Sequence, residues 1–190
     1  MPNATAAEWV LSLATTPERA ASTVGDLIEE APPRGALWFW SNVLRTASSH
    51  IWRDLRAAPL RMLGLAFAGL AAHIALLVLF EWFLNAAWKS ITESLGLSFH
   101  SAVYIGGMYV TIVLKMTASA FLAGWFLAGR SKGMAAPFAA VALIAVFSSE
   151  SLYHLANQPY PALSLATFCA LELSVIAGAV LFRRRSLAKS

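Results

Sequence analysis

The long apolar stretch from His100 to Arg130 constrains this chain more than any other feature. Between its end residues it contains one charged side chain, Lys115, near the middle. About 20 apolar residues cross the hydrocarbon core of a bilayer, so the stretch is long enough to span a membrane even when tilted. A lysine at that depth costs about 2.5–3.5 kcal/mol on insertion scales. The stretch therefore predicts a membrane helix whose ammonium group needs a partner or a water-filled cavity.

The composition predicts a small integral membrane protein. Of the 190 residues, 58% are hydrophobic and only 13% are charged, which is far more apolar than an ordinary soluble domain. The apolar runs predict four spans: Leu60–Asn85, His100–Arg130, Met134–Leu155 and Pro161–Phe182. We expect an all-α fold, with a cytoplasmic or interfacial helical segment at 1–58, a four-helix transmembrane bundle at 59–185 and a cytoplasmic tail at 186–190.

The basic residues predict the orientation of the chain. They precede the first span, join the second to the third, and follow the fourth, whereas only Lys89 lies in the opposite loops. By the positive-inside rule both termini are cytoplasmic, in the inner membrane. The outer loop at Ala86–Phe99 is expected to contain an interfacial helix with Trp88. The net charge of +4 is thus explained by topology and anionic headgroups, and we expect no nucleic-acid partner.

Residues 1–58 contain six of the ten acidic residues. Capping and spacing predict helices at Ala6–Ala14, Pro17–Glu30 and Arg34–Ala57. A small solvated helical domain is the favoured interpretation. The alternative is an interfacial helix, with aromatic residues at headgroup depth and arginines on anionic lipid. Its residues would be Trp38, Trp40, Trp52, Arg45, Arg53 and Arg56.

The segment from Pro17 to Ala47 resembles a known module. It contains Gly25-Asp-Leu followed by acidic residues up to Glu30, then Gly35 and an aromatic-rich helix with Val-Leu-Arg ending at Arg45. This pattern is similar to the permease prefix segment of some macrolide-exporter-like ABC permeases. The chain departs from those permeases because it is too short for their periplasmic domain and has no Walker motif. The resemblance implies a shared cytoplasmic interaction module and does not imply ATP-driven transport.

Three polar residues near the middle of their spans form a candidate intramembrane cluster: His73, Lys115 and Glu172. We expect Lys115 and Glu172 to be partners, with His73 nearby. In the favoured interpretation the pair neutralises itself and fixes the packing of the helices. In the alternative the histidine and the glutamate exchange protons with a substrate or a water path.

A second group of polar residues is expected near the outer face: Glu81, His100, Glu150 and His154. Two histidines and two carboxylates are chemically able to hold zinc, but interfacial residues of these types are more often solvated. We therefore assign no metal and no cofactor. The single cysteine, Cys169, excludes an internal disulfide and a CxxC motif.

The sequence favours a non-enzymatic accessory or interaction subunit, since no catalytic spacing is present. Its expected partners are the lipid bilayer and either another membrane protein or further copies of the chain. The candidate partner-binding residues are Asp26, Glu29, Glu30, Trp38 and Trp40. The alternative function is a small proton-coupled transporter or channel that uses Lys115, Glu172 and His73, and an intramembrane enzyme or metal-binding protein ranks last.

Overall fold

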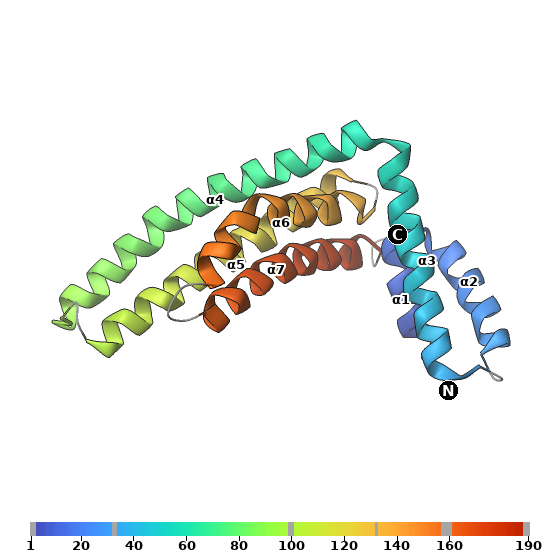
Figure 1. Ribbon diagram of the computed structural model, residues 1–190, viewed down its shortest axis with the longest axis horizontal. Helices are drawn as coiled ribbons and strands as arrows, with labels where there is room; N and C mark the ends of the chain where they lie inside the picture. Colours follow the sequence, from blue (N-terminus) through green and yellow to red (C-terminus); the bar gives the residue numbers. More distant parts are fainter. Residues whose placement is uncertain (1–2, 32–33, 99–100, 132, 157–160, 188–190) are drawn as a thin grey trace.

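The computed structural model describes residues 3–31, 34–98, 101–131, 133–156 and 161–187, with side chains described except at 147–156, 161–164 and 187. Within these residues the chain is helical and has no strand (Figure 1), which confirms the predicted all-α class. The first three helices form a domain at one end of an elongated bundle of the other four. The helices are α1 (Ala4–Ala14), α2 (Pro17–Glu30), α3 (Gly35–Ala57), α4 (Pro59–Ser94), α5 (Ala102–Arg130), α6 (Ala135–Ala156) and α7 (Pro161–Leu187).

The N-terminal helices begin where local signals predict them. The side-chain oxygen of Asn3 caps α1 by accepting a hydrogen bond from the Ala6 N–H at 3.1 Å. α2 begins at Pro17, whose missing N–H is not needed in the first turn, and Thr16 before it is extended. The three predicted helices match the observed bounds to within two residues.

Helices α1 to α3 enclose a hydrophobic core of their own, and we call them the N-terminal domain. Leu11, Val24, Phe39 and Val43 are fully buried in this core. Each helix therefore contributes one apolar stripe to the core, and its other faces are exposed at the surface of the domain. Burial of a side chain of this size stabilises a fold by about 1.5–3 kcal/mol. The segment is thus a packed unit and not three separate surface helices.

Pro59 separates α3 from α4. Ala58 before it has φ −146° and ψ 63°, outside the helical region, as expected for a residue that precedes proline. α4 then begins at Pro59, where a backbone N–H is not required. α3 leaves the start of α4 at a steep angle (Figure 1), so it crosses the end of the bundle.

α4 continues to Ser94, further than the span predicted to end at Asn85. The separate interfacial helix predicted in Ala86–Phe99 is therefore wrong, because Trp88 lies within α4. The reason is local: no glycine or proline occurs between Glu81 and Ser94 to interrupt the helix. Gly96, with φ 60°, turns the chain after the helix.

α4 and α5 form an antiparallel hairpin whose short turn sets the register. Gly69 in α4 lies against Leu127 in α5, and the Trp88 ring covers Gly107. The two members of each pair are nearly equidistant in sequence from Ser98, within the turn. A residue of α4 can therefore be matched to its neighbour in α5 from the position of the turn alone.

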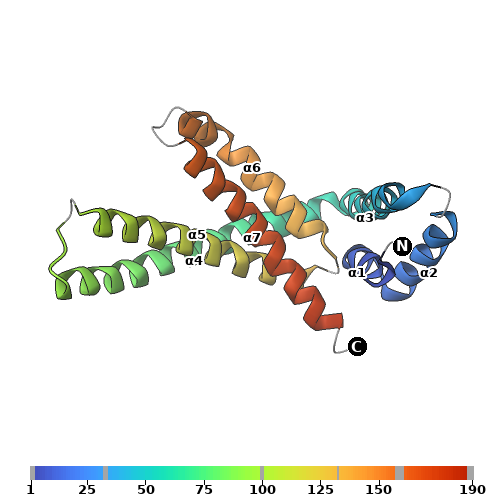
Figure 2. The ribbon, with the colours of Figure 1, turned by 90° about the horizontal axis from the view of Figure 1, so that it is seen from below.

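α5 and α7 cross at backbone contact. A Cβ atom added to Gly124 would lie 1.9 Å from the Val175 carbonyl oxygen, and one added to Gly178 would lie 2.0 Å from the Phe121 carbonyl oxygen. Small residues that let helix backbones approach are typical of membrane helix interfaces. In Figure 2, α6 and α7 lie diagonally across the α4–α5 hairpin.

The N-terminal domain contacts the bundle where α7 ends. Arg183 in α7 donates a hydrogen bond from Nη2 to the Ser12 carbonyl oxygen in α1, at 3.3 Å. Leu13 and Ile51 of the domain pack against buried bundle residues, namely Ala128, Met134 and Ala179. The C-terminal end of α7 therefore lies beside the domain that precedes α4.

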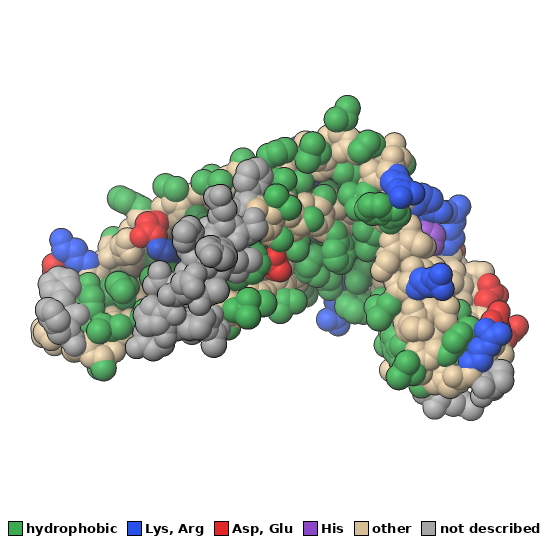
Figure 3. All heavy atoms as spheres, in the orientation of Figure 1, with side chains coloured by type: hydrophobic (Ala, Val, Ile, Leu, Met, Phe, Trp, Pro, Cys, Tyr) green, Lys and Arg blue, Asp and Glu red, His purple; other side chains and the backbone are tan. Residues whose placement is uncertain are grey.

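Among the residues that the structure describes, three helices are long and apolar enough to cross a membrane by length and composition: Pro59–Ser94, Ala102–Arg130 and Leu165–Ser186. Large apolar side chains cover the outside of the bundle (Figure 3), among them Val78, Trp82 and Val110, each more than 60% exposed. Such a surface requires lipid rather than water around it. The chain is a helical membrane protein.

Candidate functional site

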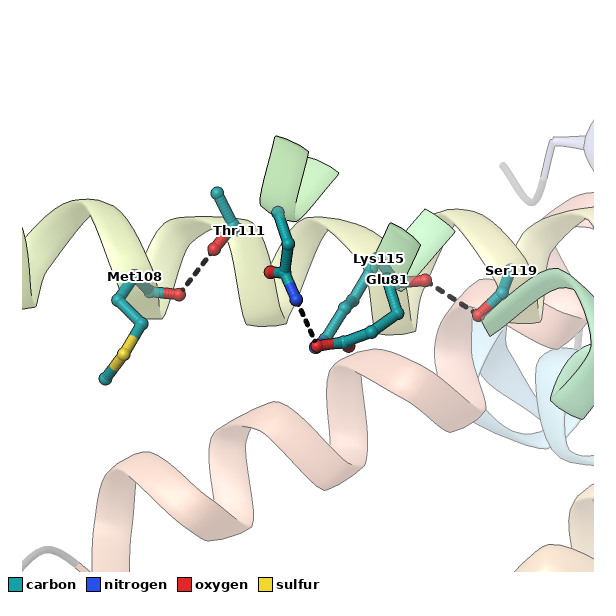
Figure 4. A network of polar contacts seen from close by, with 6 residues as sticks. Glu81, Met108, Thr111, Lys115 and Ser119 are labelled. Atoms are coloured by element: carbon teal, nitrogen blue, oxygen red, sulfur yellow. Dashed lines mark hydrogen bonds and ion pairs between the residues drawn. The ribbon is translucent and has the colours of Figure 1, made fainter. Parts of the chain in front are cut away.

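The polar centre of the bundle is an ion pair between α4 and α5. The Lys115 ammonium donates to the Glu81 carboxylate (Figure 4), and Lys115 is the more deeply placed partner, with 14% of its side chain exposed against 46% for Glu81. The second Glu81 oxygen accepts a hydrogen bond from Asn85 Nδ2 at 2.7 Å, one turn further along α4. Both carboxylate oxygens therefore have a donor.

Hydroxyl groups on the same side of α5 are satisfied within their own helix. Ser119 Oγ donates to the Lys115 carbonyl oxygen at 2.7 Å, and Thr111 Oγ1 donates to the Met108 carbonyl oxygen at 2.7 Å (Figure 4). Ser119 is fully buried. These hydroxyl groups thus need no partner in another helix, and Lys115 is the member of this face that reaches across to another helix.

The predicted partner of Lys115 was Glu172, and that prediction is wrong. The structure pairs Lys115 with Glu81, which the sequence assigned to the outer face. The physical reason is the hairpin register, because Glu81 and Lys115 are equidistant from Ser98. Glu172 lies half-buried on α7 next to Leu171, which packs in the core between α5, α6 and α7.

His73 lies apart from the ion pair on the same helix. The residue is 6% exposed, and it lies beside the backbone of Ser119 in α5. Its Nδ1 atom has no partner among the described residues. His73 and Glu81 are about two helical turns apart, or about 12 Å along the axis. The structure therefore does not join His73, Lys115 and Glu172 into one cluster.

The predicted outer group cannot be assembled from the described residues. His100 lies outside them, and so do the side chains of Glu150 and His154. Glu81, the remaining member, is the partner of Lys115. In the described part of the chain, no group of three or more histidine, cysteine, aspartate or glutamate side chains could hold a metal ion.

The candidate partner-binding residues divide into two sets. Asp26, Glu29 and Glu30 are exposed on α2, and Glu30 forms a surface ion pair with Arg34 at 3.2 Å. Trp38 and Trp40 are instead partly buried and pack against the core of the N-terminal domain. The two tryptophans are therefore mainly structural, and the acidic residues are the accessible ones.

Sequence reasoning missed the role of Arg183. The Arg183–Arg185 run was interpreted only as a sign of orientation, yet Arg183 is half-buried and bonded to α1, whereas Arg184 and Arg185 are exposed. The sequence offered no signal that separates Arg183 from the two arginines that follow it.

Comparison with protein-family models, with curated proteins and with solved structures found no match to this chain. The class of the molecule therefore follows from its own features: a helical membrane protein with an N-terminal three-helix domain and an ion pair between two apolar helices.

Proposed function

We propose that the chain is a four-span inner-membrane protein that acts as an accessory subunit, without catalysis of its own, and binds a partner through its N-terminal domain. The observation that carries this proposal is a folded domain with exposed acidic residues, held at one end of the bundle by Arg183. A domain with its own core presents a defined surface at low entropic cost on binding.

The four-span topology is supported by the positions at which the chain enters and leaves the bundle. α7 ends beside α1, on the side from which α3 leads into α4. Such an arrangement favours an even number of crossings, and α6, with 22 residues, supports a fourth span. The basic residues near both ends of the bundle favour a cytoplasmic location for both termini.

The exposed residues Asp26, Glu29 and Glu30 favour a partner with a basic surface, since charge complementarity steers encounter and fixes the binding orientation. The resemblance of Pro17–Ala47 to the permease prefix segment supports a partner that is itself part of a membrane complex. The Lys115–Glu81 pair has a structural role in this proposal, because each charge neutralises the other.

The test is affinity purification in mild detergent followed by mass spectrometry, comparing the wild type with Asp26→Lys/Glu29→Lys. This variant is preferable to deletion of residues 1–58, which would expose Ala128, Met134 and Ala179. We expect the double variant to lose a stoichiometric partner.

Glu93→Lys, at the opposite end of the α4–α5 hairpin, is the matched control and should retain it. Recovery of the same proteins with all three chains would contradict the proposal, and recovery of the chain alone as an oligomer would replace it with self-association.

A second candidate, a proton-coupled transporter or channel, is favoured by one observation. His73 is buried within an apolar helix and its Nδ1 atom has no partner among the described residues. Intramembrane titratable groups often belong to proton paths. Proteoliposomes with an imposed pH gradient should then show a flux that His73→Gln or Glu172→Gln removes, and an equal flux in both variants and the wild type would exclude this role.

A further inference from the structure

The outward face of α3 carries large apolar side chains that the domain core does not use. Leu37, Leu44 and Trp52 are 86%, 58% and 55% exposed. Their spacing places them on one side of the helix, with Ser48 between them. Phe39 and Val43 point from a different side into the core. We call the exposed set, Leu37, Leu44 and Trp52, the α3 stripe.

Arginines flank the α3 stripe. Arg45 and Arg56 are exposed, and the Arg56 guanidinium lies over the Trp52 ring at 4.8 Å from its centroid. The only acidic residue of α3 is Asp54, which is half-buried. Apolar and aromatic side chains beside arginine on one helix face are typical of a helix at a membrane interface, where the guanidinium reaches the headgroups.

The position of α3 places this face at the level where lipid begins. α4 starts at Pro59, and its first turns already expose Leu60, Leu63 and Phe67, at 83%, 46% and 45%. These side chains require hydrocarbon around them, so Trp52, about two turns before Pro59, lies near the headgroups.

The direction of α3 and the distribution of charge both fit contact between α3 and the membrane surface. In Figure 1, α3 runs steeply across the long axis of the bundle, and therefore along the membrane plane. In Figure 3, green apolar side chains follow the edge of the N-terminal domain that faces the bundle, and red acidic ones gather at the opposite edge. An anionic surface would repel the second edge, and the apolar side chains of the first edge favour contact with lipid.

From these observations we infer that α3 is an interfacial helix that docks on anionic lipid headgroups, with the α3 stripe inserted and Arg45 and Arg56 on the lipid charges. This set keeps Trp52, Arg45 and Arg56 from the interfacial alternative considered from sequence. Trp38 and Trp40 are not part of it, because they pack against the domain core. The contact holds the acidic α2 surface away from the membrane, where a partner can reach it. This inference about α3 does not depend on the identity of any protein partner.

The test uses the purified full chain in vesicles, with Cys169 replaced by serine and a nitroxide label on Ser48→Cys. Ser22→Cys, exposed on α2, is the matched label site. Collisions with a water-soluble nickel chelate and with lipid-soluble oxygen report the depth of each label. In vesicles containing phosphatidylglycerol, we expect nickel collisions to be lost at position 48 and retained at position 22. In pure phosphatidylcholine, position 48 should regain them.

The charge requirement is tested in the same vesicles. Arg45→Gln/Arg56→Gln should restore nickel collisions at position 48, whereas Arg19→Gln/Lys89→Gln removes the same charge elsewhere and should not. Equal nickel collisions at positions 48 and 22 in the anionic vesicles would overturn the inference. Protection at position 48 that is the same in both lipids and in both double variants would also overturn it. No other protein is present, so a protein partner cannot account for protection.

Discussion

Lys115 in α5 is paired with Glu81 in α4, and the two residues are equidistant in sequence from the turn at Ser98. The α4–α5 hairpin is therefore a self-contained unit in which a short turn brings an acid to a base inside an apolar pair of helices. The pair makes it unnecessary for α7 to supply a counter-charge. It also explains how an apolar helix with one lysine is tolerated in the membrane.

Breaking this pair on one side should destabilise the hairpin. Glu81→Gln leaves the mostly buried ammonium of Lys115 without its counter-charge, and we expect a loss of about 1–3 kcal/mol in the free energy of unfolding. Replacing both partners, as in Glu81→Gln/Lys115→Met, should recover most of that loss, because two neutral side chains of similar size to the originals leave no unpaired charge. Unfolding by denaturant in detergent, followed by tryptophan fluorescence, measures both effects.

Glu93→Gln is the control for that comparison. Glu93 pairs with Lys89 at 3.8 Å near the tip of the hairpin, and both side chains are mostly exposed. A surface pair of this kind contributes about 0–1 kcal/mol. A Glu81→Gln loss no larger than that of Glu93→Gln would show that the Lys115–Glu81 pair does not hold the hairpin together.

The crossing of α5 and α7 should tolerate no side chain at its glycines. Gly124→Ala would place Cβ 1.9 Å from the Val175 carbonyl oxygen, and because that neighbour is backbone, the helices must separate. We expect a loss of about 1–3 kcal/mol, typical of overpacking. Gly106→Ala, where no atom lies within 4 Å of the added Cβ, should be neutral or slightly stabilising. Equal stability of the two variants in the same unfolding assay would refute the close crossing.

The core of the N-terminal domain gives a third prediction. Phe39 is fully buried, so Phe39→Ala should cost about 3–5 kcal/mol of the stability of this domain. Hydrogen exchange in α1 to α3 should become fast while α4 to α7 stay protected. Ile28→Ala, at a side chain that is 38% exposed, should leave exchange nearly unchanged. Simultaneous loss of protection in all seven helices would instead show that domain and bundle unfold together.

Helix starts could be predicted from the sequence where proline acts locally: Pro17 begins α2 and Pro59 begins α4. The start of α1 was predicted two residues late, at Ala6, because the cap at Asn3 was overlooked. The partner of Lys115 could not be predicted from the depth of polar residues in the membrane, because Glu172 lies at a similar depth in its own predicted span. The register of the α4–α5 hairpin, set by its turn, places Glu81 opposite Lys115 instead. The α5–α7 crossing could not be predicted in the same way, because many glycines occur in the spans and only the packing shows which two meet another backbone.

Arg183 should control the attachment of the N-terminal domain to the bundle. Its Nη2 atom bonds the Ser12 carbonyl oxygen near the C-terminal end of α1, where helix carbonyls favour a cation. Arg183→Gln should weaken this contact, and hydrogen exchange in α1 should rise while the core around Phe39 stays protected. Arg184→Gln removes the same charge from the neighbouring, exposed residue and should leave exchange in α1 unchanged. If both variants raise it equally, the general positive charge at the end of α7 holds the domain, and the specific bond from Arg183 does not.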